Sequence, residues 1–155
     1  MAQLQTDLSE FVRLLNFHKV EYVVVGGHAV AFHGHPRFTG DIDFFINATE
    51  DNALRVLEVL SDFGFGNIGI RAQDLTASDK VVQLGRPPNR IDLLTTISGV
   101  TFGEAWRTRV AGHLGDHAVD FLGWNALLLN KTVAGREKDQ LDVKTLLKIA
   151  ERKKV

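Results

Sequence analysis

The sequence has no cysteine among its 155 residues, so it can form neither disulfide bonds nor thiolate metal sites. Its formal net charge is only -1, which excludes a strong overall field toward nucleic acid. No apolar stretch approaches the ~20 residues that cross a membrane. Residues 1–7 lack the basic start and apolar core of a secretory signal. We therefore expect a cytoplasmic location without membrane contact.

Repeats and low-complexity linkers are also missing from the chain. With 45% hydrophobic and 24% charged residues, the composition is that of an ordinary globular protein. A chain of this length can bury a sizeable core. We expect one domain, covering residues 1–155.

The spacing of apolar residues predicts helices interspersed with short strands. Leu4, Leu8, Phe11, Val12 and Leu15 recur at helical spacing and predict an N-terminal amphipathic helix. Strands are predicted at 21–25, 41–46, 81–84, 90–94, 110–114 and 118–122. Further helices are predicted after Gly27 and at 49–63, 102–109, 124–134 and 138–150. This order predicts an α/β (α+β) fold with a mixed sheet and packed helices.

Two aspartates, Asp41 and Asp43, stand one residue apart at the start of an apolar strand. Successive side chains alternate along a strand, so both carboxylates share one face and Ile42 points to the other. Two anions side by side repel each other unless a cation lies between them. Magnesium, which prefers carboxylate and phosphate oxygens, fits this position.

A glycine pair, Gly26 and Gly27, ends the preceding strand and opens a short helix. Glycines let the backbone approach a phosphate, and a helix N-terminus favours its negative charge. An ordinary strand-to-helix turn would look the same. The pair is neither a G-x-G-x-x-G motif nor a P-loop, which disfavours Rossmann and Walker sites.

A third carboxylate, Asp92, interrupts the predicted apolar strand at 90–94 and shares a face with Arg90. If this strand lies beside the strand of Asp41, three carboxylates converge. Such a cluster can hold two metal ions, and Asp92 could take a proton from an attacking hydroxyl. The alternative is a structural acid paired with Arg90.

Cations and acids alternate in the last two helices. Lys131 continues the apolar face of the first of them, so its alkyl stem can follow the core and place its ammonium at a cleft edge. Arg136 and Lys138 precede Asp139 and Asp142, which continue the inward face of the final helix. This cluster either grips a triphosphate or locks the helix onto the sheet. For Lys131 and Asp139 a surface or salt-bridge role remains open.

Taken in order, these motifs resemble the nucleotidyltransferase superfamily related to DNA polymerase beta. The segments that carry the resemblance are Val25-Gly26-Gly27-His28-Ala29, Arg37-Phe38-Thr39-Gly40-Asp41-Ile42-Asp43, Arg90-Ile91-Asp92-Leu93-Leu94, and Lys131 with Arg136, Lys138, Asp139 and Asp142. The chain is most similar to small uncharacterised bacterial members, akin to the nucleotidyltransferase toxins of abortive-infection systems and to lincosamide nucleotidyltransferases. The resemblance implies a small mixed β-sheet with helices packed mainly on one face.

The resemblance also implies site residues. Asp41, Asp43 and Asp92 are the implied metal ligands and catalytic acids. The implied nucleotide-binding residues are Gly26, Gly27, Arg37, Thr39, Lys131, Lys138 and Asp139. For Arg37, anchoring its own loop is an equal alternative. The glycine turn carries His28 where the family commonly has a serine, so phosphate contacts there would rest on backbone amides.

The implied activity moves a nucleoside monophosphate from a nucleoside triphosphate to a hydroxyl, with Mg²⁺ or Mn²⁺ as cofactor and pyrophosphate as second product. The acceptor is left open among a small molecule, a tRNA end and a protein side chain, and a homodimer or a toxin–antitoxin partner is conceivable. Two other interpretations remain: a non-catalytic nucleotide-binding regulator or antitoxin-like partner, and a structural interaction domain whose acids only form salt bridges.

Overall fold

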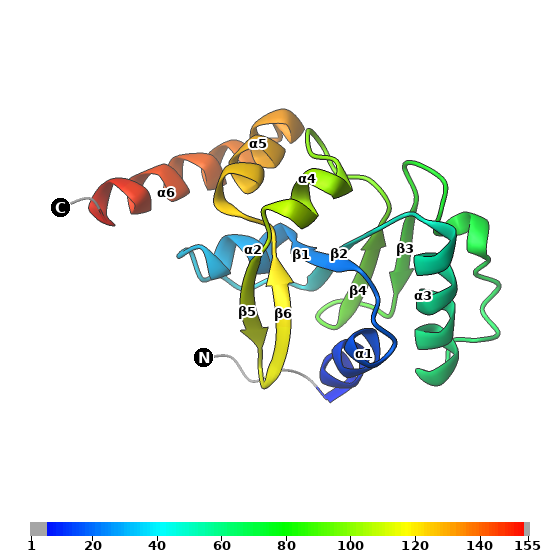
Figure 1. The fold of residues 1–155 in the computed structure, drawn as a ribbon. Coiled ribbons are helices and arrows are strands. Elements are labelled where there is room, and N and C mark those ends of the chain that lie inside the picture. The colour runs from blue at the N-terminus through cyan, green and yellow to red at the C-terminus, as the bar shows by residue number, and fades with distance from the viewer. Residues whose placement is uncertain (1–5, 154–155) are drawn as a thin grey trace.

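The computed structural model describes residues 6–153, which form a mixed sheet with helices around it (Figure 1). The helices are α1 (Thr6–Phe17), α2 (Gly26–Phe32), α3 (Glu50–Asp62), α4 (Phe102–Arg107), α5 (Trp124–Ala134) and α6 (Glu137–Lys153), with a 3-10 turn η1 (Ala72–Asp74). The strands are β1 (Tyr22–Val25), β2 (Asp41–Ile46), β3 (Val81–Leu84), β4 (Arg90–Leu94), β5 (Val110–Leu114) and β6 (His117–Phe121).

The predicted strands and helices are confirmed within a residue or two at most ends, and the α6 helix runs slightly further than expected. The turn η1 was not predicted, and Leu4 of the predicted first helix lies outside the described residues. Among residues 6–153, no helix is long and apolar enough to cross a membrane.

The six strands lie in the order β3-β4-β2-β1-β6-β5. The central strand β2 pairs antiparallel with β1 and parallel with β4. Strand β1 pairs parallel with β6, and the outer pairs β3–β4 and β5–β6 are antiparallel. The mixed α+β fold expected from the sequence is therefore confirmed, and the sheet places β2 and β4 side by side.

Helices pack against both faces of this sheet. Phe44 and Phe45 are neighbours on β2 and so point to opposite faces. The Phe44 ring lies 5.9 Å from Phe11 of α1, and the Phe45 ring lies 5.2 Å from Phe102 of α4. Figure 1 shows α1 and α4 on opposite sides of the sheet. The resemblance had implied helices mainly on one face; here α4 adds cover on the face that carries Asp41 and Asp43.

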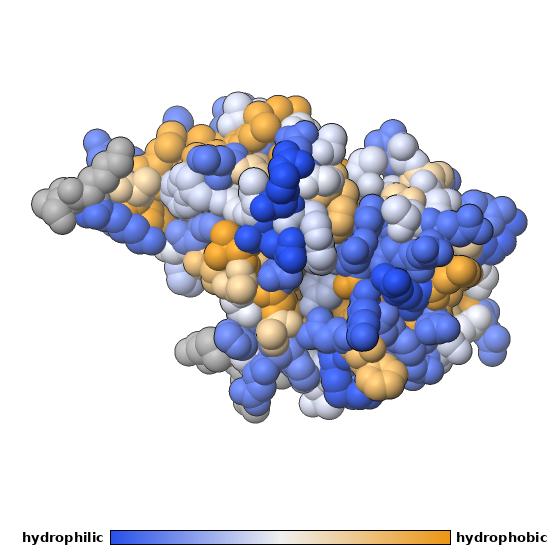
Figure 2. All heavy atoms as spheres, in the orientation of Figure 1, coloured by the Kyte–Doolittle hydropathy of each residue, from blue (hydrophilic) through white to orange (hydrophobic). Residues whose placement is uncertain are grey.

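The paired helices α5 and α6 contact each other and extend beyond the sheet (Figure 1). Gly135 ends α5 in the left-handed conformation, with φ 67°, and lets the chain reverse into α6. Figure 2 shows apolar residues along this side of the molecule. Exposed apolar side chains on these two helices are Leu129, Val133, Leu141 and Leu147.

Asn52 is a buried polar residue that joins α3 to the start of β1. Its side-chain oxygen accepts a hydrogen bond from the Glu21 amide at 2.7 Å, and its nitrogen donates to the carbonyls of Glu21 and Asn47 at 3.0 and 2.8 Å. Only 1% of Asn52 is exposed, so water cannot replace these bonds. Asn52 thereby pairs with the backbone amide of Glu21 and the carbonyl of Asn47, and adds a second donor to the Glu21 carbonyl, which also accepts from the Asn47 amide at 3.1 Å.

We expect Asn52→Ala to lower the free energy of unfolding by about 2–4 kcal/mol, because three hydrogen bonds are lost and their backbone partners stay buried. Urea denaturation followed by circular dichroism measures this change. The matched control is Asn125→Ala, at an exposed position of α5, which should stay within about 0.5 kcal/mol of the parent. Equal stability of both variants would contradict the role given to Asn52.

Candidate metal centre

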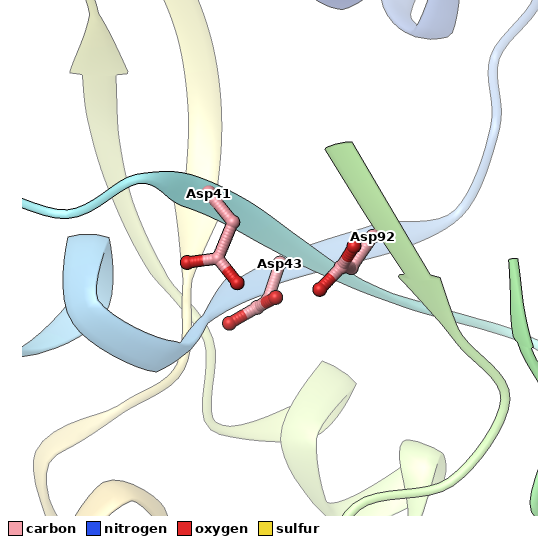
Figure 3. Close-up of side chains that lie close together, drawn as sticks. All are labelled: Asp41, Asp43 and Asp92. Atoms are coloured by element: carbon pink, nitrogen blue, oxygen red, sulfur yellow. The ribbon is translucent and has the colours of Figure 1, made fainter. Parts of the chain in front are cut away.

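Three carboxylates meet on one face of the central strands (Figure 3). In the parallel pairing of β2 with β4, Asp43 lies opposite Asp92 and Asp41 lies opposite Arg90. Asp41, Asp43 and Asp92 can each offer one oxygen such that these oxygens all lie within 4.8 Å of one another. The condition set by the sequence, that the strand of Asp92 lies beside the strand of Asp41, is met.

Gly26 fits against this triad because it has no side chain. Its φ is +68°, a conformation that favours glycine, and a Cβ atom built on it would lie 2.1 Å from Oδ2 of Asp43. A Cβ on Gly27 would lie 3.2 Å from the Cβ of Thr39. The glycine pair thus lets the start of α2 close onto Asp43 and onto the loop before β2. Contact of its amides with phosphate stays a prediction.

The electrostatics of the triad are dominated by burial and mutual repulsion. Burial, together with the charges of Asp41 and Asp92, raises the pKa of Asp43 to about 7. Burial also raises the pKa of Asp92, although hydrogen bonds from Arg90 and Asp43 act in the opposite direction. Near neutral pH the triad therefore holds part of a proton instead of its full charge.

Arg90 is the cation that contacts the triad. Its Nη2 atom donates to Asp41 at 2.7 Å and to Asp92 at 3.2 Å, and its Nε donates to Asp92 at 3.0 Å. Arg90 thus bridges two of the three acids from the position beside Asp41 in the sheet. The sequence placed Arg90 on the face of Asp92 but did not show its contact with Asp41, because that depends on strand pairing.

A second charged cluster joins α5 and α6 to the loop before β2. Lys131, which is 4% exposed, lies 3.2 Å from both Asp139 and Asp142. Asp142 also pairs with Arg37 of that loop, and Asp139 pairs with Arg136 at 2.6 Å. Five residues are thereby held in one network: Arg37, Lys131 and Asp139, which the resemblance implied as nucleotide-binding, and Arg136 and Asp142 from the segments that carry it.

The ion pairs of this network determine the charge state and the exposure of its members. Burial opposes the ionisation of Asp139, but hydrogen bonds from Arg136 and Lys131 outweigh it and keep the pKa of Asp139 below its usual value. The Lys131 ammonium lies between two carboxylates, deeper than the cleft edge expected for it. Arg136, with 63% of its side chain exposed, and the exposed Lys138 present positive charge to solvent.

The positive charge of Arg136 lies close to the triad. The hydrogen bond to Asp139 raises the pKa of Arg136, and the charges of Asp43 and Asp142 add to this increase. Arg136 therefore lies within electrostatic range of Asp43. Thr39 is also near: its hydroxyl donates to the backbone carbonyl of Asp41 at 2.8 Å and fixes the start of β2.

A model of the family described as "Nucleotidyltransferase of unknown function (DUF6036)" matches residues 2–151, nearly the whole chain. The chain belongs to this nucleotidyltransferase family. The superfamily assignment drawn from the motifs is thereby confirmed. A comparison with curated proteins finds no match.

For a nucleotidyltransferase, the residues present fit a divalent metal. The donor set is three carboxylates, the hard oxygen ligands that Mg²⁺ and Mn²⁺ prefer. The raised pKa of Asp43 and the contacts of Arg90 with Asp41 and Asp92 both indicate that the negative charges of the triad favour a cation between them. Asp41, Asp43 and Asp92 are therefore the residues that would hold the metal.

Without metal, the stability of the protein should depend on the protonation of Asp43. The folded state keeps this proton up to about pH 7, whereas the unfolded chain releases it near pH 4. The free energy of unfolding contributed by Asp43 should therefore fall as the pH rises from 4 to 7, and level off above. Thermal unfolding in EDTA should show this fall in the parent and a shallower one in Asp43→Asn. If stability depended on pH in the same way in the parent and in Asp43→Asn, the role given to the Asp43 proton would be contradicted.

Arg90 should compete with a divalent cation, because both neutralise Asp41 and Asp92. We expect Arg90→Gln to bind Mn²⁺ about tenfold more tightly in titration calorimetry without nucleotide, the scale of one lost charge-assisted contact. Arg109→Gln is the matched control, since Arg109 pairs with Asp120 at 3.1 Å away from the triad. Weaker Mn²⁺ binding in Arg90→Gln would show instead that Arg90 supports the metal site.

Proposed function

We propose that the protein transfers a nucleoside monophosphate from a nucleoside triphosphate to a hydroxyl group and releases pyrophosphate. The observation that carries this proposal is the convergence of Asp41, Asp43 and Asp92 on one face of adjacent strands. Membership in a nucleotidyltransferase family supports the reaction class. The identity of the triphosphate and of the acceptor goes beyond this support.

In the proposed reaction the acceptor oxygen forms a bond to the α-phosphorus, and the bond from that phosphorus to the bridging oxygen breaks. Pyrophosphate leaves with the bonding electrons, and the hydroxyl proton passes to Asp92. Bound Mg²⁺ or Mn²⁺ supplies charge neutralisation for the phosphoryl group and for the attacking oxygen. Asp41, Asp43 and Asp92 would hold the metal, and Asp92 would also take the proton of the attacking hydroxyl.

The cationic residues divide into two groups in this proposal. We assign contact with the triphosphate to Arg136 and Lys138, which are both exposed, and the charge of Asp43 contributes to the raised pKa of Arg136. Lys131 and Arg37 are held by Asp139 and Asp142 and act as positioning residues, which fix α6 and the loop before β2. Direct phosphate contact by Lys131 would require its ammonium to leave two carboxylates. The amides of Gly26 and Gly27 would complete the phosphate contacts.

The decisive variant is Asp92→Asn. It keeps the shape of the side chain and both other acids, so nucleotide affinity measured with a nonhydrolysable triphosphate should change less than about threefold. Pyrophosphate release should fall at least about a hundredfold, because positioning and charge stabilisation carry most of phosphoryl-transfer catalysis. The assay uses labelled triphosphates, Mg²⁺ and cell extract as the source of acceptor.

Asp120→Asn is the matched control, because Asp120 also lies on a strand and pairs with an arginine. It should keep the turnover of the parent. Retained turnover in Asp92→Asn would contradict the three-carboxylate mechanism. Nucleotide binding by the parent without any pyrophosphate release would instead favour a non-catalytic regulator.

A further inference from the structure

A cavity of about 590 Å³ lies beside the triad and shares Asp41 with it. Asp43 and Asp92 do not line it, so it opens on the Asp41 side of the triad. Its walls come from five segments: α1, α2, the loop before β2 with the start of β2, the turn before β4 with the start of β4, and the β5–β6 hairpin. The volume lies within the range of roughly 300–1,000 Å³ typical of small-molecule sites.

Most of the lining is apolar and much of it is aromatic. The apolar side chains that define it are Leu8, Phe32, Phe38, Ile91, Leu114 and Phe121. The rings of Phe32 and Phe121 stack with their centroids 4.2 Å apart and make a flat wall. Phe38 is 83% exposed at the opening, where a bound ring could cover it. Such a lining favours a ligand with a flat apolar body.

The charged side chains in the lining are already neutralised. Arg37 pairs with Asp142, and Arg90 pairs with Asp41 and Asp92. Neither Arg136, which pairs with Asp139, nor the exposed Lys138 lines this cavity. A triphosphate with several negative charges therefore finds its counter-charges outside the cavity, and an uncharged molecule suits the inside.

His28 supplies a polar group at the cavity wall. Its Nδ1 atom is buried and has no hydrogen-bond partner among the described residues. Burial lowers the pKa of His28, so the ring is neutral and can accept or donate one hydrogen bond.

We propose that this cavity binds the acceptor of the transfer reaction, and that the acceptor is an uncharged small molecule with an aromatic or alicyclic body of two or three rings and a hydroxyl at the Asp41 end. This inference rests on the proposed function and selects one of the three acceptor classes left open by the sequence. The apolar body lies against Phe32 and Phe121, and the hydroxyl lies where the triad can receive its proton.

The first test uses 4-methylumbelliferone, a two-ring fluorescent molecule with one hydroxyl, without metal or nucleotide. The parent should bind it in a fluorescence titration, and Phe38→Ala should weaken binding at least about fivefold. The matched control is Phe17→Ala, an aromatic residue that is 68% exposed outside the cavity and should change binding less than about twofold. Absence of binding to the parent, or equal effects of both variants, overturns the proposal.

The second test adds Mg²⁺ and a nonhydrolysable ATP analogue. A ternary complex, in which the analogue leaves the affinity for 4-methylumbelliferone within about threefold, supports an acceptor site. Displacement of the probe by the analogue, or by adenosine alone, would make the cavity the nucleobase site and overturn the proposal. Transfer of labelled nucleotide to the hydroxyl of the probe would support it directly.

A third variant separates this inference from the proposed function. Asp43→Asn combined with Asp92→Asn changes acids that do not line the cavity, so it should bind the probe as the parent does while losing metal-dependent binding of the ATP analogue. If the parent binds the probe but never releases pyrophosphate, the proposed function fails. If it releases pyrophosphate with extract but does not bind the probe, only the acceptor class fails.

Discussion

The structure around the site depends on one electrostatic constraint: three carboxylates must share one face of a sheet at close range. The parallel pairing of β2 with β4 brings the carboxylates into mutual repulsion, because it places Asp43 opposite Asp92. In the absence of metal, the contacts of Arg90 and the raised pKa of Asp43 reduce this repulsion. This leaves part of the negative charge of the three carboxylates unbalanced. A divalent cation, which carries two positive charges, would balance more of it than Arg90 does.

The α5–α6 network serves a different purpose from the triad. Buried ion pairs contribute little net stability, because the desolvation of both partners offsets their attraction. They are nevertheless directional, and breaking one leaves a buried charge alone. Lys131, Asp139 and Asp142 therefore fix where α6 sits relative to the loop that carries Arg37. That placement keeps Arg136 within electrostatic range of Asp43, and the apolar cavity lies on the Asp41 side of the triad.

Much of the arrangement of the site residues could be predicted from the sequence, because it depends on the periodicity of side chains within one strand or one helix. The alternation of side chains along a strand predicted that Asp41 and Asp43 share one face, and that Asp92 shares a face with Arg90. Helical spacing predicted that Lys131 lies on the inward face of its helix. Strand order is not local, so the Arg90–Asp41 contact was not predictable. Lys131 was expected at a cleft edge because snorkelling is the usual fate of a lysine on an apolar face. The two acids of α6 that hold it are on a separate helix whose docking the sequence does not specify. The cavity is built from five separate segments, and no single motif indicates it.

The missing side chain of Gly26 has a consequence for comparing sequences of this family. A Cβ at this position and the carboxylate of Asp43 cannot occupy their places together. A relative that carries any other residue there must have shifted its second acid or moved the turn away from the sheet. The residue at this position can be read from a genome without a structure. Glycine there marks the relatives that can form the same arrangement of three acids, and any other residue marks those that cannot.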